Sequence, residues 1–103
     1  MAQFDIYLNP GTKKIEVPYL VSVQNDHITN KTGTTVVIPL RANTPPVEIM
    51  APSVGVGKYG NFVLSTNEIF AIDTSRLKAP IAKLSIADRS KIKPALDKVV
   101  GEY

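Results

Sequence analysis

One stretch of the sequence has the spacing of a phosphate-binding loop. Residues 55–60 read GVGKYG and fit the pattern G-x-G-x-x-G. A dinucleotide site needs such a loop between a strand and a helix, because free N–H groups at the helix N-terminus hold the pyrophosphate. The residues that follow, 61–66, read NFVLST and have the composition of a strand. The stretch therefore predicts a β-hairpin turn with Lys58 and Tyr59 at its tip.

The sequence contains one histidine, His27, and a Ser-His-Asp triad or a histidine-rich metal site would have to include it. It lies beside Asp26 in a polar loop, which is typical of a solvated side chain. The carboxylates lack the spacing of an acid–base pair, and no cysteine is present for thiolate catalysis. We therefore expect no enzymatic activity, no metal and no cofactor. Asp26 and His27 are candidates for contact with a partner.

Three arginines, Arg41, Arg76 and Arg89, would bind phosphate together only if the fold gathered them. Solvated surface charges are the simpler interpretation. The net charge of +3, from 12 Lys and Arg against 9 Asp and Glu, is too small by itself to indicate nucleic-acid binding. We expect no direct sequence-specific contact with nucleic acid.

The sequence also bears on location. No apolar run approaches the roughly 18 residues that a membrane-spanning helix needs. The first residues, MAQFDIYL, lack the basic and apolar regions of a signal peptide, and the absence of cysteine fits a reducing compartment. We therefore expect a cytoplasmic protein without membrane contact.

Most of the chain reads as short strands separated by turns. Residues 3–8 alternate, which predicts a strand with Phe4, Ile6 and Leu8 on one face and Tyr7 on the other. An Asn-Pro-Gly turn follows directly and ends this strand.

Three later segments also read as strands. Residues 19–24 and 34–40 are rich in the β-branched and aromatic side chains that pack well on a sheet. Pro39 has no N–H to donate, so we expect its strand to end there or to lie at a sheet edge. Residues 69–73 are apolar on both faces, so this strand is either central or meets another subunit.

The apolar period changes near the end of the chain and predicts an α-helix. Ser85 is a good N-cap, and Asp88 three residues later supports it. Pro94 should kink the helix or mark its true start near Ser90. One helical face is formed by Ile92, Ala95, Leu96, Val99 and Val100. The 103 residues therefore predict a single domain over 1–103, mostly β with a C-terminal α-helix.

Two linked motifs carry a resemblance. Residues 21–26 read VSVQND, and residues 33–40 read GTTVVIPL. Together with Gln3-Phe4, the APSVGV of residues 51–56, Phe62 and Leu84-Ser85, they make nearly the whole chain similar to the CcdB family of toxin–antitoxin toxins. The resemblance implies a small SH3-like twisted β-barrel, as in CcdB and MazF. It also implies a homodimer, a cognate antitoxin, and a toxin that binds the DNA gyrase A subunit and stabilises its cleaved-DNA complex.

In the CcdB family the chain closes with Trp-Gly-Ile, which contacts gyrase. Aligned without a gap from Leu84-Ser85, this chain has Val100 for the tryptophan, Gly101 for the glycine, Glu102 for the isoleucine and Tyr103 as an extra residue. An alternative alignment on Ile92-Lys93 places Gly101 on the tryptophan. The resemblance makes residues 100–103 the gyrase-binding candidates. For the dimer interface we expect an apolar patch of Ile69, Phe70, Ile72 and Val99.

Two alternatives stay open. One is a CcdB-like homodimer that binds an antitoxin and no longer poisons gyrase. The other is a ribonuclease like MazF or Kid, which needs a basic side chain to neutralise charge on the scissile phosphate. Such toxins carry a basic residue near the equivalent of Thr34-Thr35, whereas residues 33–40 contain no Arg or Lys. We rank the ribonuclease below the gyrase toxin.

Overall fold

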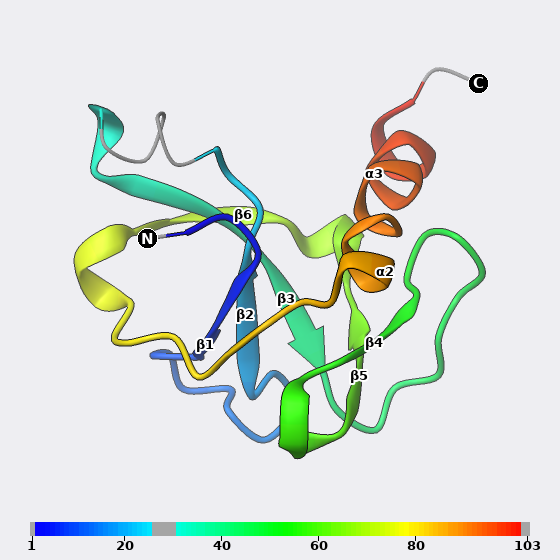
Figure 1. Ribbon diagram of the computed structural model, residues 1–103, viewed down its shortest axis with the longest axis horizontal. Coiled ribbons are helices and arrows are strands. Elements are labelled where there is room, and N and C mark those ends of the chain that lie inside the picture. The colour runs from blue at the N-terminus through cyan, green and yellow to red at the C-terminus, as the bar shows by residue number, and fades with distance from the viewer. Residues whose placement is uncertain (1, 26–30, 102–103) are drawn as a thin grey trace.

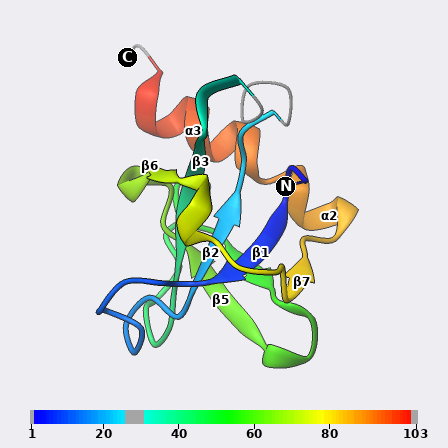
Figure 2. The ribbon, with the colours of Figure 1, turned by 90° about the vertical axis from the view of Figure 1, so that its left-hand side faces the viewer.

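The computed structural model describes residues 2–25 and 31–101 (Figure 1). Most of it is one antiparallel sheet with the strand order β4-β5-β3-β2-β1-β7, and β6 pairs with β3 outside this path. The strands are β1 (Asp5–Leu8), β2 (Tyr19–Ser22), β3 (Thr34–Arg41), β4 (Ser53–Gly55), β5 (Asn61–Leu64), β6 (Phe70–Asp73) and β7 (Ala82–Lys83). Figures 1 and 2 show that the sheet is strongly curled, with helices α2 (Ile86–Arg89) and α3 (Ile92–Val100) at one end. The predicted fold class, a mostly-β twisted barrel with a C-terminal helix, is confirmed.

Strand β3 lies at the centre of the sheet and runs through Pro39 to Arg41, so the prediction that it ends at Pro39 or lies at an edge was wrong. One side of β3 changes partner along its length: Thr34–Val37 pair with β6, and Leu40 and Arg41 pair with β5. The carbonyl of Pro39 faces that side, where it accepts a 2.9 Å bond from the Ser65 N–H. The missing N–H of Pro39 therefore falls in the gap between two partner strands and costs no ladder bond there.

The curled sheet has a hydrophobic cluster on each face, and β1 contributes to both. Ile6 packs in the larger cluster with Val21, Leu40 and Leu64. Tyr7 is fully buried in the smaller cluster, whose other members are Val17, Leu20, Val37, Ile72 and Leu77. The alternation predicted for residues 3–8 was therefore wrong in part, because Tyr7 is buried and Leu8 is 58% exposed.

The glycine-rich stretch forms the predicted hairpin turn. A 3₁₀ turn, η1 (Gly57–Tyr59), joins β4 to β5, and the N–H of Val56 donates to the carbonyl of Gly60 at 2.8 Å. Gly57 and Gly60 have φ angles of 49° and 102°, which other residues adopt only with strain. The stretch leads into a strand and supplies no helix N-terminus for a pyrophosphate.

The helical region begins as predicted, with the Ser85 side chain accepting the N–H of Asp88 at the start of α2. The helix breaks after Arg89, and Pro94 lies in the first turn of α3, where its missing N–H is tolerated. Two further 3₁₀ turns, η2 (Thr66–Glu68) and η3 (Thr74–Arg76), flank β6. Within residues 2–25 and 31–101, no helix is long and apolar enough to cross a membrane.

Candidate functional site

Helix α3 is the element that presents the predicted target-binding residues. Ile92 and Ala95 are buried against the larger cluster, and the helix contacts η2. Beyond this anchored part the helix extends away from the sheet (Figure 1). Val100 at its end is 72% exposed, and the N–H of Gly101 closes the helix on the Asp97 carbonyl at 2.8 Å. An apolar side chain is therefore held in solvent at the tip of a fixed helix.

The start of the helical region is tied to the sheet through Asp88. One carboxylate oxygen accepts the backbone N–H of Gly55 at 2.9 Å, and the other pairs with the Lys91 ammonium at 2.9 Å. The same ammonium donates to the carbonyl of Ser53 at 3.0 Å. Partial burial raises the pKa of the Asp88 carboxyl, but the bonds from Gly55, Lys91 and Ser85 outweigh it and leave that pKa lowered. Asp88 is therefore ionised at neutral pH and connects α2 to β4.

A groove of about 350 Å³ runs between α3 and the first residues of the chain. Its floor includes Phe4, whose φ of 73° is unusual for a bulky residue. Backbone bonds hold Phe4 there: its N–H donates to Ser22, and its carbonyl accepts the N–H of Leu84. The Arg89 guanidinium lies 5.1 Å from the centre of the Phe4 ring and donates to the Leu84 carbonyl at 3.0 Å. Arg89 therefore packs against the groove as a cation on an aromatic face.

The predicted dimer residues lie in different environments. Ile72 is buried within the smaller cluster and offers no surface to a partner. Ile69 is partly buried against the larger cluster, and Val99 is half-buried on α3. Phe70 is 41% exposed on β6, a strand that pairs with β3 outside the main path of the sheet. The dimer prediction remains a prediction, with Phe70 as its most accessible apolar side chain.

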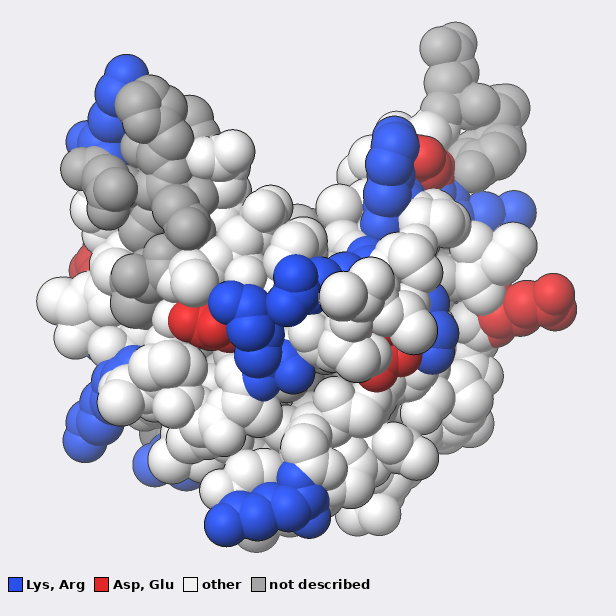
Figure 3. All heavy atoms as spheres, in the orientation of Figure 1, with Lys and Arg blue, Asp and Glu red and all other residues white. Residues whose placement is uncertain are grey.

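The three arginines are not gathered into one site. Arg41 forms a two-point ion pair with Glu68, with Nε 2.5 Å and a terminal nitrogen 2.7 Å from the carboxylate oxygens. The bond from Arg41, assisted by the Ser65 hydroxyl at 2.5 Å, lowers the pKa of the Glu68 carboxyl to about 2. Arg89 stacks on Phe4, and Arg76 lies on η3. Figure 3 shows basic and acidic side chains interspersed over one face, without a large patch of one sign.

Several sequence-predicted residues fall outside the described part of the chain: Asp26 and His27 in the loop, and Glu102 and Tyr103 at the end. Of the gyrase-binding candidates the structure places Val100 and Gly101. Sequence reasoning missed the stacked pair of Phe4 and Arg89, because residues so distant in the chain give no local signal. Among the described residues no cluster of His, Asp or Glu could hold a metal ion.

Comparison of the sequence with family models gives one match, described as CcdB protein, over residues 3–101. The chain belongs to the CcdB family. The resemblance drawn from the VSVQND and VVIPL motifs is thereby confirmed. No protein of curated function matches this CcdB-family chain by sequence.

Solved structures similar to this CcdB-family chain include named endoribonucleases and MazF toxins. An endoribonuclease from a mycobacterial species, solved with its cognate antitoxin, has a TM-score of 0.78 at 19% identity, covering 100% of this chain and 97% of its own. The Mycobacterium tuberculosis toxin MazF-mt6 has a TM-score of 0.74 at 12% identity, covering 95% of each chain. MazF of a MazE–MazF complex from Deinococcus radiodurans has a TM-score of 0.71 at 13% identity, covering 98% of this chain and 95% of its own. At these identities the likeness establishes the shared fold.

The expectation that the chain is not an enzyme is contradicted by these neighbours. Two of the similar structures are named endoribonucleases, so the fold is one in which covalent chemistry is done. The expectation relied on the absence of a familiar catalytic motif in the sequence. Such an absence is uninformative here, since a site can be assembled from residues far apart in the chain.

Proposed function

We propose that this protein is the toxin of a type II toxin–antitoxin system, that it binds the DNA gyrase A subunit through the end of α3, and that it stabilises the cleaved-DNA complex of gyrase. Membership of the CcdB family over residues 3–101 supports the toxin assignment. Toxins of the same fold include one solved with its cognate antitoxin and one solved as a MazE–MazF complex, which supports an antitoxin as partner. We further propose that it acts as a homodimer in the cytoplasm.

The observation that carries the gyrase proposal is the presentation of Val100. An apolar side chain that is 72% exposed at the end of a helix has no role in the core of its own domain. The helix beneath it is fixed by buried Ile92 and Ala95 and, through Lys91 and Asp88, by the bonds to β4. A rigid apolar tip of this kind loses little conformational entropy when it is buried in a partner.

A second candidate function is RNA cleavage, which the structural neighbours favour. A named endoribonuclease matches the whole chain with a TM-score of 0.78. The basic residue expected near Thr34-Thr35 is absent, and the nearest arginine on β3, Arg41, is bound by Glu68 in a two-point ion pair. If this chain cleaves RNA, the basic side chains of its active site must therefore come from elements other than β3.

Induction of the protein in a host whose antitoxin gene is deleted tests the proposal. We expect growth arrest, double-strand breaks in the chromosome and intact RNA. Growth arrest with fragmented RNA and unbroken DNA would instead establish the ribonuclease. Normal growth with the folded protein present would exclude both toxin activities, and the remaining alternative would be a homologue that binds an antitoxin without being toxic. Co-expression of the cognate antitoxin is the control, and it should restore growth in either toxin case.

A further inference from the structure

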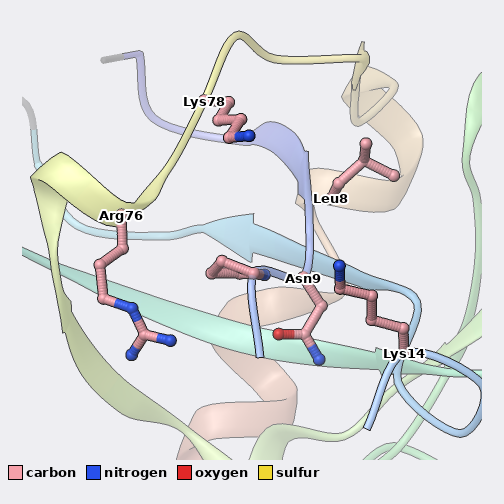
Figure 4. Close-up of a pocket in the computed structure, with 6 residues that line it drawn as sticks. Leu8, Asn9, Lys14, Arg76 and Lys78 are labelled. Carbon is pink, nitrogen blue, oxygen red and sulfur yellow. The ribbon is translucent and has the colours of Figure 1, made fainter. Parts of the chain in front are cut away.

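A second cavity, of about 170 Å³, lies between the loop that follows β1 and the segment that follows η3. Leu8, Asn9, Pro10, Lys14, Arg76 and Lys78 line it. Figure 4 shows Arg76 and Lys78 on one side of the space, Lys14 and Leu8 on the other, and Asn9 near the middle. Three of the six lining residues are cationic, and none is acidic. The cavity is therefore an electropositive hollow in a protein whose net charge is only +3.

Hydrogen bonds of Asn9 fix the loop that supplies Lys14. The Asn9 amide donates to the Val17 carbonyl at 2.8 Å, and its oxygen accepts the N–H of Gly11 at 2.8 Å. The backbone N–H of Asn9 also donates to the Pro18 carbonyl at 3.0 Å. The side chain of one residue thus joins both ends of the loop and sets the position of the cavity wall.

The opposite wall is fixed by packing. Leu77, between Arg76 and Lys78, is buried in the smaller cluster with Tyr7 and Val17. The N–H of Leu77 closes η3 on the Thr74 carbonyl at 3.0 Å. The backbone that carries the two cations is therefore anchored to the same core as the opposite wall. The backbone on both sides of the cavity is held in place before any ligand arrives, which reduces the entropic cost of binding.

The three cations have no protein partner that explains their arrangement. Within residues 2–25 and 31–101, none of Lys14, Arg76 and Lys78 forms an ion pair, whereas Arg41, Lys83, Lys91 and Lys93 do. Like charges that line one cavity repel each other, and an anion placed between them removes this repulsion. The cavity is smaller than the roughly 300 Å³ typical of sites for drug-sized ligands, so it suits a compact anion or one group of a larger ligand.

We propose that this cavity is a phosphate-binding site formed by Lys14, Arg76 and Lys78. A phosphate has more acceptor oxygens than the two of a carboxylate, and it can accept from a planar guanidinium and two ammonium groups that converge from different directions. The phosphate comes either from a small phosphorylated molecule or from the backbone of a nucleic acid, which is contacted without sequence readout. The proposal stands independently of the gyrase proposal, because none of these residues belongs to α3.

The test is an NMR titration of the ¹⁵N-labelled full chain with three probes: inorganic phosphate, a mixed-sequence single-stranded RNA oligonucleotide, and a polyglutamate peptide. We expect saturable shifts of the amides of Asn9, Gly11, Arg76 and Leu77 with phosphate. The double variant Arg76→Gln/Lys78→Gln should weaken binding by about tenfold or more. The control Lys31→Gln/Lys58→Gln removes the same charge from exposed positions outside the cavity and should bind as the wild type does. Unchanged spectra for residues of the smaller cluster verify that each variant is folded.

The outcomes separate the sources of the phosphate. If the oligonucleotide binds more tightly than inorganic phosphate, in a salt-dependent way that the cavity variant loses, the phosphate site is supported and its ligand is a nucleic-acid backbone. Saturable binding of inorganic phosphate, without binding of the oligonucleotide, supports the phosphate site and indicates that its ligand is a small phosphorylated molecule. The proposal is overturned if no probe gives saturable shifts at the cavity, or if both variants weaken binding equally. Preferential binding of polyglutamate would also overturn it and indicate an acidic protein segment instead.

Discussion

The carboxylate of Asp88 accepts the backbone N–H of Gly55 at 2.9 Å, which joins the first turn of the C-terminal helical region to strand β4. The two residues are far apart in the chain, and the bond is reinforced by Lys91, which contacts both Asp88 and the Ser53 carbonyl. Asp88 lies in α2, which directly precedes α3, so this bond is one of the contacts that hold the base of α3 against the sheet. A carboxylate outside the proposed gyrase-binding tip therefore contributes to the position of that tip, together with buried Ile92 and Ala95.

Replacement of Asp88 should destabilise the domain. In Asp88→Ala the N–H of Gly55 loses its acceptor and Lys91 loses its counter-ion, and we expect the free energy of unfolding to fall by about 2 kcal/mol. Urea unfolding followed by circular dichroism measures this change. Asp73→Ala removes an exposed carboxylate from β6 and should change stability by less than about 0.5 kcal/mol. Equal effects of the two substitutions would show that the bond to Gly55 is not structural.

Stability should depend on the ionisation of Glu68. Its pKa is lowered to about 2, chiefly by the hydrogen bond from Arg41. A carboxyl whose pKa is lowered in the folded state stabilises the fold fully at pH values above its unfolded-state pKa of about 4.3. This contribution to stability is lost as the pH falls toward 2. The Glu68 side chain is 40% exposed, so solvent screening reduces the contribution to about 1 kcal/mol.

The variant Glu68→Gln tests this ionisation. It should be less stable than the wild type at pH 6, and the difference should shrink as the pH falls from 4.5 to 2. Urea midpoints measured across this range give the comparison. Glu48→Gln removes a different exposed carboxylate and should retain the wild-type dependence on pH. A constant difference between Glu68→Gln and wild type at every pH would mean that packing, rather than charge, explains the effect.

The dimer prediction can be tested at Phe70. This side chain is 41% exposed on β6, which among the described residues pairs with β3 alone, and a charge placed there would have to be desolvated in any apolar interface. We expect wild-type protein at micromolar concentration to sediment as a dimer, and Phe70→Lys as a monomer. Ile86→Lys, at an exposed apolar position on α2, is the control and should remain dimeric. A dimeric Phe70→Lys protein would place the interface elsewhere.

A chain that ends at Val99 should fold but lose toxicity. The truncation removes Val100, which is mostly exposed, and the bond from the Gly101 N–H to Asp97, so the melting temperature should fall by only a few degrees. Colony counts after induction measure toxicity. Ile15→Ser alters another exposed apolar residue outside α3 and should stay toxic. Killing by the truncated chain would move the active surface away from the tip.

The parts of the fold that the sequence predicted well are those with local causes. Ser85 caps a helix because Asp88 is three residues away, and the GVGKYG hairpin forms because its glycines permit positive φ. Of the two alternatives given for Pro94, a kink or a helix start near Ser90, the structure shows the second, with Pro94 in the first turn of α3.

The predictions that failed depend on tertiary context. Tyr7 is buried because the sheet curls and has a core on each face, which a single strand cannot reveal. Pro39 fits a central strand only because β3 changes partner beside it. Arg76 and Lys14 line one cavity although they are far apart in the sequence, so no spacing rule could connect them.

The measurement that tests the central claim most directly is a gyrase cleavage assay. Purified protein is mixed with gyrase from its own host, ATP and supercoiled plasmid, and the reaction is quenched with detergent and protease. We predict linear DNA that depends on the protein and is lost with the chain that ends at Val99. No linear DNA, from protein shown to be folded and dimeric, would contradict the proposal that the end of α3 binds gyrase and stabilises its cleaved-DNA complex.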